Sequence, residues 1–93
     1  MIIAVMTIDL HAPWVHSLKE KRREVKSLLT RIRAQFNVSA TEVANQDVHQ
    51  TISIGIATIA ANGAQADSTL DNVIRFVEAN SDAQIISVER ERR

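Results

Sequence analysis

The chain has 93 residues, and this length fits a single domain, residues 1–93, with room for one hydrophobic core. It contains no cysteine, which excludes disulfides and thiolate metal sites, and no apolar run reaches the roughly 18 residues that a membrane span needs. The formal net charge is zero, which argues against a protein that coats nucleic acid indiscriminately. We therefore expect a soluble, cytoplasmic protein.

The first half of the chain predicts a strand, a helix and a hairpin. Residues 1–10 are largely β-branched or apolar on both faces until Asp9, which is typical of a central strand. In residues 17–36, Ser17 and Glu20 form a capping box that predicts the start of a helix. The apolar residues of this helix recur at helical spacing; they are Leu18, Val25, Leu28, Leu29, Ile32 and Phe36. Residues 38–43 and 48–60 predict two strands, joined by a turn at 44–47.

The second half predicts one more helix and one more strand. Residues 62–67 indicate a loop, and Ser68 indicates the start of a helix whose apolar residues Leu70, Val73 and Val77 lie on one face. Residues 84–88 predict the last strand, and residues 89–93 form a charged tail that would blunt a sheet edge. The order is βαββαβ. It predicts an α+β, ferredoxin-like split β-α-β fold, a four-stranded antiparallel sheet with two helices on one face.

The first helix carries most of the positive charge. Seven of the eleven Lys and Arg residues lie between residues 17 and 36, against the two acids Glu20 and Glu24, so this segment has a charge of +5 and the remainder −5. At about 100° per residue, five of the cations share one arc beside the apolar stripe, and both acids lie on the other side. These candidate RNA-binding residues are Lys19, Arg22, Arg23, Lys26 and Arg33. A basic arc of this kind suits contact with phosphates, and the alternative is a solvated helix face.

The predicted topology gathers polar residues at one edge of the sheet. The first strand ends, the first helix begins and the hairpin turns at this edge, so distant segments meet there. The residues of this candidate edge site are His11, Trp14, His16, Gln46 and Asp47. Trp14 suits a stacking or partner-anchoring role, or closes the end of the core.

An enzyme using Asp9, His11 and His16 is a third, weaker hypothesis. The two histidines have no defining ligand spacing, and no Gly-rich phosphate loop is present. We therefore expect no catalytic residue, no metal and no cofactor.

The outward sheet face is predicted to lack aromatic residues, which argues against base stacking there. Small and apolar residues such as Val5, Gly55 and Ala57 favour a self-complementary contact instead. We expect a homodimer packed through this face, or a partner protein there.

Several strings of residues carry a family resemblance. They are Asp9-Leu10-His11-Ala12-Pro13, His16-Ser17-Leu18-Lys19-Glu20-Lys21-Arg22-Arg23, Val25-Lys26-Ser27-Leu28, Phe36-Asn37-Val38-Ser39, Glu42-Val43 and Gln46-Asp47. With these strings the chain resembles the YlxP-like family of small bacterial proteins of unknown function. The resemblance implies a ferredoxin-like fold, and members are often encoded beside translation-initiation and ribosome-maturation genes. It therefore points to a ribosomal or RNA context and implies no activity.

Together these observations predict a non-enzymatic RNA- or ribosome-associated module that contacts phosphates through its basic helix. The alternative is a protein-interaction or structural homo-oligomer with no nucleic-acid role.

Overall fold

The structure, a computed structural model, describes residues 1–93. The chain forms four strands and two helices in the order βαββαβ. Their bounds are β1 Ile2–His11, α1 Leu18–Gln35, β2 Ser39–Ala44, β3 Thr51–Ala60, α2 Gly63–Asn80 and β4 Gln84–Arg92. The strands make one sheet in the order β2-β3-β1-β4, and every neighbouring pair is antiparallel. This arrangement confirms the predicted ferredoxin-like fold.

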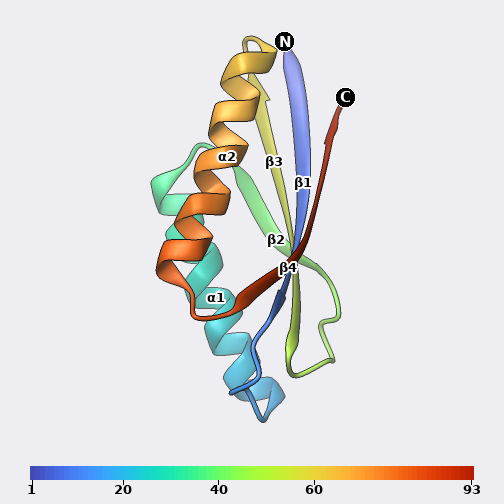
Figure 1. The fold of residues 1–93 in the computed structure, drawn as a ribbon, viewed down its shortest axis with the longest axis vertical. Coiled ribbons are helices and arrows are strands. Elements are labelled where there is room, and N and C mark those ends of the chain that lie inside the picture. Colours follow the sequence, from blue (N-terminus) through green and yellow to red (C-terminus); the bar gives the residue numbers. More distant parts are fainter.

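Both helices lie on one side of the sheet, and the other face carries no helix (Figure 1). The two termini lie at the same end of the molecule. There the backbone N–H of Arg93 donates to the carbonyl of Ile3 at 2.7 Å. The loop between β2 and β3 lies on the side of the sheet away from the helices. We call the helix-free side the open face.

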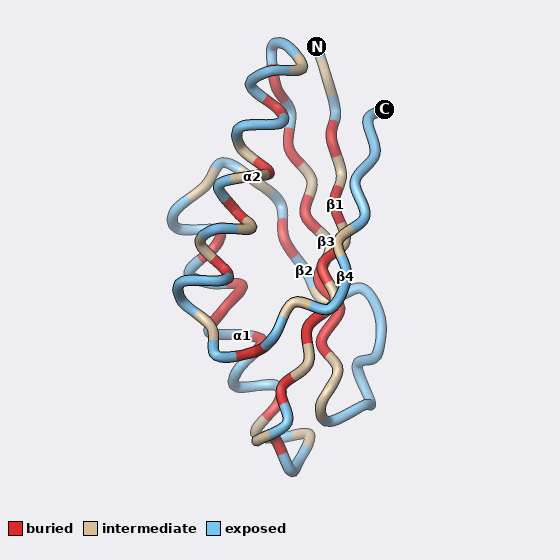
Figure 2. The backbone as a smooth tube through the Cα atoms, in the orientation of Figure 1, coloured by how far each residue is buried: buried red, intermediate tan, exposed pale blue.

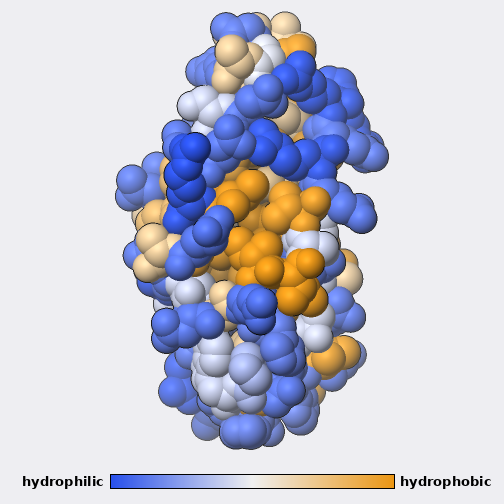
Figure 3. All heavy atoms as spheres, viewed as in Figure 1, coloured by the Kyte–Doolittle hydropathy of each residue, from blue (hydrophilic) through white to orange (hydrophobic).

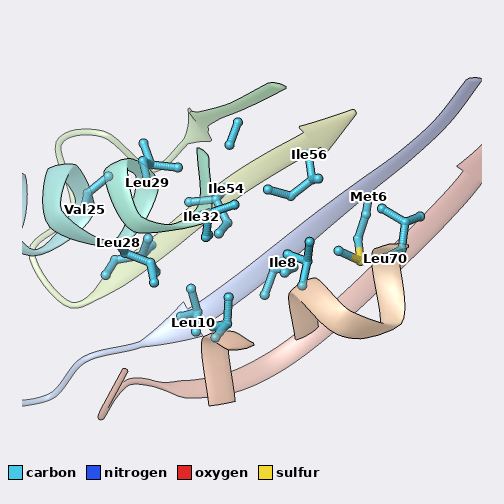
Figure 4. Close-up of a cluster of buried hydrophobic side chains, with 14 of the residues drawn as sticks. Met6, Ile8, Leu10, Val25, Leu28, Leu29, Ile32, Ile54, Ile56 and Leu70 are labelled. Atoms are coloured by element: carbon cyan, nitrogen blue, oxygen red, sulfur yellow. The ribbon is translucent and has the colours of Figure 1, made fainter. Parts of the chain in front are cut away.

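The hydrophobic core fills the space between the helices and the sheet. Alternate residues of β1 and β3 are buried beneath the helices, whereas the intervening residues are mostly less buried (Figure 2). The apolar stripes of α1 and α2 pack against them (Figure 4). The side chains that meet in the core include Met6, Ile8, Leu10, Val25, Leu28, Leu29, Ile32, Ile54, Ile56 and Leu70. Burial of one such side chain stabilises the fold by about 1.5–3 kcal/mol.

Helix α2 begins at Gly63, earlier than the predicted start at Ser68. The Asn62 side chain accepts a hydrogen bond from the backbone N–H of Gln65 at 2.9 Å, and the Gln65 side chain accepts one from the N–H of Ala61 at 2.8 Å. This reciprocal cap satisfies two N–H groups at the helix start. The predicted loop at 62–67 is therefore wrong, because Asn62-Gly63 initiates a helix here instead of a turn.

The strand boundaries also differ from the prediction at two places. β4 continues to Arg92, because the expected charged tail pairs with β1 as far as Ala4. β3 begins at Thr51 instead of Val48, which leaves residues 45–50 as a loop. Apolar side chains gather at the centre of the view in Figure 3, in the region where β4 passes α2. In β4, Ile85 and Val88 are half-buried against the core and Ile86 is exposed.

Two arginines of β4 connect the edge of the sheet to α2. Arg90 Nη1 lies 2.5 Å from Asp71 Oδ1, and Arg92 Nη2 lies 2.8 Å from Asp67 Oδ2. The hydrogen bond from Arg90 lowers the pKa of the Asp71 carboxyl below its ordinary value, and the charges of Arg90 and Arg75 act in the same direction, against a smaller desolvation effect. These pairs are exposed enough for solvent to screen them.

The cap of α2 gives a prediction for stability. Replacing Asn62 by Ala removes the acceptor for the Gln65 N–H and should lower the free energy of unfolding by about 1 kcal/mol, measured by urea denaturation. Asn72→Ala, in the middle of the same helix, is the control; it removes only an exposed hydrogen bond from Arg75 and should cost less. Equal losses in the two variants would contradict the cap.

The Asp71–Arg90 pair gives a prediction for pH dependence. Because the folded-state pKa of Asp71 is lowered, its contribution to stability is complete above the ordinary aspartate pKa of about 4 and is lost as the pH falls through the lowered value. The difference in unfolding free energy between wild type and Asp71→Asn should therefore shrink on acidification from pH 7 to about pH 3. Asp82→Asn, at an exposed residue without an ion pair, is the control. A difference that stays constant with pH would refute the assignment.

Candidate functional site

Four cations of α1 form an exposed surface that we call the basic face. Its residues are Lys19, Arg22, Arg23 and Lys26, all on the flank of the helix beside its buried stripe. None of the four side chains makes an ion pair or a hydrogen bond within the chain, since the salt bridges lie elsewhere. Their charges are therefore free to meet a ligand.

Arg33, the fifth cation predicted for this surface, already has a partner. Its Nε donates to the carbonyl of Ala40 at 3.1 Å, and its Nη2 donates to the same oxygen. Ala40 belongs to β2, an edge strand of the sheet. The guanidinium thus connects the end of α1 to the edge of the sheet. It adds positive charge near the basic face, but two of its nitrogens already donate hydrogen bonds within the fold.

Arg31 is also engaged, on another side of the helix. Its Nη1 donates to the carbonyl of Asn80 at 3.1 Å, and its Nε donates to that of Ser27 at 3.4 Å. The first bond satisfies a carbonyl at the C-terminal end of α2 and links the two helices. Arg31 therefore serves helix packing and lies outside the basic face.

Lys21 is a buried cation that the analysis of the sequence missed. Only 1% of its surface is exposed, and its ammonium lies 3.0 Å from Glu42 Oε2. It also donates to the backbone carbonyl of Asn45. Glu42 Oε2 is buried and accepts no hydrogen bond of ordinary geometry, so the ammonium is its only partner. A helical wheel places Lys21 within the apolar stripe, between Leu28 and Val25. This position could have predicted from the sequence that Lys21 is buried.

Asn45 links this ion pair to the open face. Its φ of 58° is left-handed, which Asn tolerates better than most residues. Its Nδ2 donates to Ser53 Oγ at 2.8 Å, and Ser53 Oγ donates to Asp9 Oδ1 at 2.6 Å. Ser87 Oγ donates to the other oxygen, Asp9 Oδ2, at 2.8 Å. Hydrogen bonds thus run across the sheet from the end of β2 to β4, and both carboxylate oxygens of Asp9 have partners within the fold.

The loops at the predicted edge meet, but Gln50 makes the contacts. Its Nε2 donates to the backbone carbonyls of Pro13 and Val15, at 3.0 and 3.1 Å. Its backbone carbonyl accepts a hydrogen bond from the N–H of Ala12 at 2.8 Å. Gln50 therefore fixes the connection between β1 and α1 to the start of β3. No sequence pattern predicts this role, because an isolated glutamine has no distinctive spacing.

The predicted edge-site residues lie around this junction with different surroundings. His11 is the last residue of β1 and is half-buried, whereas His16, Gln46 and Asp47 are exposed. The backbone N–H of His16 donates to Glu20 Oε2 at 3.4 Å, as part of the α1 cap. No hydrogen bond or ion pair joins the side chains of these residues to one another. Their role as a site stays a prediction.

Trp14 faces the helices and not the β2–β3 loop. It is half-buried against the core and lines a small pocket of about 120 Å³ with Leu28, Arg31 and residues at the end of α2. This position closes the end of the core, one of the two roles considered for Trp14. No group of three His, Cys, Asp or Glu side chains is arranged to hold a metal ion. Neither helix is long and apolar enough to span a membrane.

Comparison with known proteins identifies a matching family and a curated relative. The family described as "Protein of unknown function (DUF503)" matches residues 3–90. The "Uncharacterized protein YlxP" of Bacillus subtilis (strain 168) is 41% identical over 63 residues, which is 68% of each chain. These matches confirm the resemblance found in the residues, and neither description assigns an activity.

The buried ion pair gives a prediction for stability. Lys21→Met leaves Glu42 without its partner and should lower the free energy of unfolding by about 3 kcal/mol, at the lower end for a broken buried pair because the Glu42 side chain is 18% exposed. Lys26→Met, at an exposed position, is the control and should stay near wild type. Adding Glu42→Gln to Lys21→Met should recover part of the loss. Equal stability of Lys21→Met and Lys26→Met in urea denaturation would contradict this account.

Proposed function

The chain belongs to this family of proteins of unknown function, and from its surface we propose that it is a non-enzymatic RNA- or ribosome-associated module. In this proposal the basic face of α1 binds phosphates in the cytoplasm. The observation that carries the proposal is the group of four exposed cations on one helix flank without acidic partners. Arg33 supplies additional positive charge at the far end of the helix.

The basic face is poorly explained by helix stability alone. Lys19 and Arg23 are four residues apart, as are Arg22 and Lys26, and like charges at this spacing destabilise a helix by roughly 0.2–0.5 kcal/mol per pair. Lys19 also lies in the first turn of α1, where the helix dipole disfavours positive charge. A ligand that neutralises these charges would remove both costs. These costs favour the interpretation that the basic face binds phosphates, and they argue against a face that only contacts solvent.

The spacing of the cations also suits a polyanion. Lys19 and Lys26 are seven residues apart, which is about 10 Å along the helix axis, and the two arginines lie between them. Arginine guanidinium groups bind phosphate through paired N–H donors, and lysine contributes a point charge. A surface of this kind contacts successive phosphates of a strand without reading its bases.

The open face offers no base-stacking platform. The three aromatic residues of the chain, Trp14, Phe36 and Phe76, all pack against the core. Across the open face the register instead pairs Val5 with Ala57 and Thr7 with Gly55. We therefore place the RNA on α1 and not on the sheet, and we expect binding that depends little on base sequence.

The alternative function is a protein-interaction or structural homo-oligomer with no nucleic-acid role. The uncovered open face, with exposed Ile59 and Val43, favours it as a second candidate. In that case association with a partner would be unchanged by nuclease treatment.

Charge reversal tests the proposed function. The triple variant Arg22→Glu, Arg23→Glu, Lys26→Glu should lose co-sedimentation with ribosomal subunits and with free ribosomal RNA at low salt, because its phosphate contacts become repulsive. All three side chains are exposed, so the fold should survive, as circular dichroism would show.

A matched pair of single variants controls for net charge. Arg23→Glu changes the basic face, whereas Arg75→Glu makes the same charge change on α2, which carries no other cation. We expect RNA binding to fall in Arg23→Glu and to stay near wild type in Arg75→Glu. Equal RNA binding by the wild type and the triple variant would contradict the proposal.

A further inference from the structure

The half of the open face near the chain termini carries uncovered apolar side chains. Ile3 and Ile59 are register partners on β1 and β3, and they are 37% and 65% exposed. Val43, which is 48% exposed, lies over Gly55 on the same face, since a Cβ at position 55 would come within 2.7 Å of its methyl group. Three of the six large hydrophobic side chains that the fold leaves exposed thus belong to one surface.

Between these side chains the surface is hollowed and lined by small residues. A shallow groove of about 470 Å³ runs over β1, β2 and β3, and Gly55 and Ala57 form part of it. The rest of its open side is lined by Val5, Thr7, Ser39, Thr41, Val43 and Arg93. A neighbouring hollow of about 370 Å³ shares Ser39 and Ala57 and extends to Ile3 and Ile59. The two hollows form a continuous surface without an aromatic side chain.

Charged groups on the open face lie at its rim or already have partners. The Asp9 carboxylate accepts hydrogen bonds from Ser53 and Ser87, so it needs no ligand. On the β4 side, Glu91 pairs with Arg93 at 2.9 Å. Arg93 also lines the groove, and Glu89 on the same strand has no partner. A partner that removes water from the centre of the face must therefore keep the Glu91–Arg93 pair together and leave Glu89 in solvent at the rim.

The strand edges are less suitable for a partner than the face. On β2, the Arg33 guanidinium occupies the carbonyl of Ala40. On β4, charged residues alternate from Glu89 to Arg92, and the pairing with β1 is interrupted by a register shift beside Asp9. Both features protect edges against strand addition. A partner is therefore expected to pack on the face.

We propose that a second copy of this chain covers the open face, giving a two-fold dimer with the sheets inside and the helices outside. Two faces that carry mainly small side chains can pack closely against each other, because no large side chain needs a matching pocket on the other copy. Four strands span about 19 Å and five residues of each about 17 Å, so each face has a flat area of about 320 Å² and two copies would bury at least about 650 Å². This area is smaller than the roughly 1,200–2,000 Å² of a stable interface and corresponds to a weak dimer. Both basic faces stay free in it, so the dimer does not depend on the proposed RNA binding.

Sedimentation velocity of the full chain over about 1–200 µM tests this proposal. Wild type should shift from monomer to dimer with rising concentration. Ala57→Arg places a long cation in the groove and should raise the dissociation constant at least tenfold, whereas Ala79→Arg makes the same change on the exposed surface of α2 and should leave it unchanged. Ile59→Lys, at a 65% exposed residue, should weaken the dimer without depending on how Ala57→Arg folds.

Three outcomes would overturn the proposal. Wild type that stays monomeric at every concentration would assign the face to a different partner. A dimer that persists in both Ala57→Arg and Ile59→Lys would place the interface elsewhere. Equal weakening by Ala57→Arg and Ala79→Arg would show a general effect of added charge.

Discussion

The buried ammonium of Lys21 fixes how α1 sits on the sheet. A charged group with 1% exposure is tolerated only where partners surround it, and here the partners are Glu42 and the carbonyl of Asn45. Because Lys21 must face inward, the rotation of α1 about its axis is set. Arg22 and Arg23, the next two residues, are then held toward solvent. The orientation of the basic face thus depends on this interior ion pair together with the buried apolar stripe of α1.

The same contact connects the two sides of the sheet. The backbone carbonyl of Asn45 accepts a hydrogen bond from the Lys21 ammonium, and its side-chain amide donates one to Ser53 on the open face. The hydrogen bonds then continue through Asp9 to Ser87. Hydrogen bonds from two directions can hold the loop at Asn45 in one position. The network occupies one half of the open face and leaves the apolar half free, so the molecule offers a basic surface on α1 and a mainly apolar surface on its sheet.

The sequence predicted the local elements well because their signals are local. The capping box at Ser17 and the apolar stripe of α1 required only spacing along the chain. The cap at Asn62 is also local, since Gln65 stands three residues later, but residues 62–67 were predicted as a loop. In contrast, the length of β4 depends on pairing with β1, far away in the chain, so its charged end looked like a tail.

The candidate site was predicted less completely for the same reason. The wheel identified the cations of the basic face, but the partner of Arg33 is the carbonyl of Ala40, which has no side-chain signal. Lys21 could have been separated from the other cations by its position in the apolar stripe. The role of Gln50 could not have been predicted, because its contacts with the β1–α1 connection follow from the tertiary fold alone.

The most direct test of phosphate binding by α1 is the salt dependence of RNA binding by the wild-type protein. Four cations that each neutralise one phosphate of a single strand predict that log K falls against log salt with a slope of about −3. Between 50 and 200 mM salt this corresponds to a loss of affinity of roughly 50-fold. A slope of this size would support a phosphate-binding helix. Absence of binding at low salt, or a slope near zero, would contradict it.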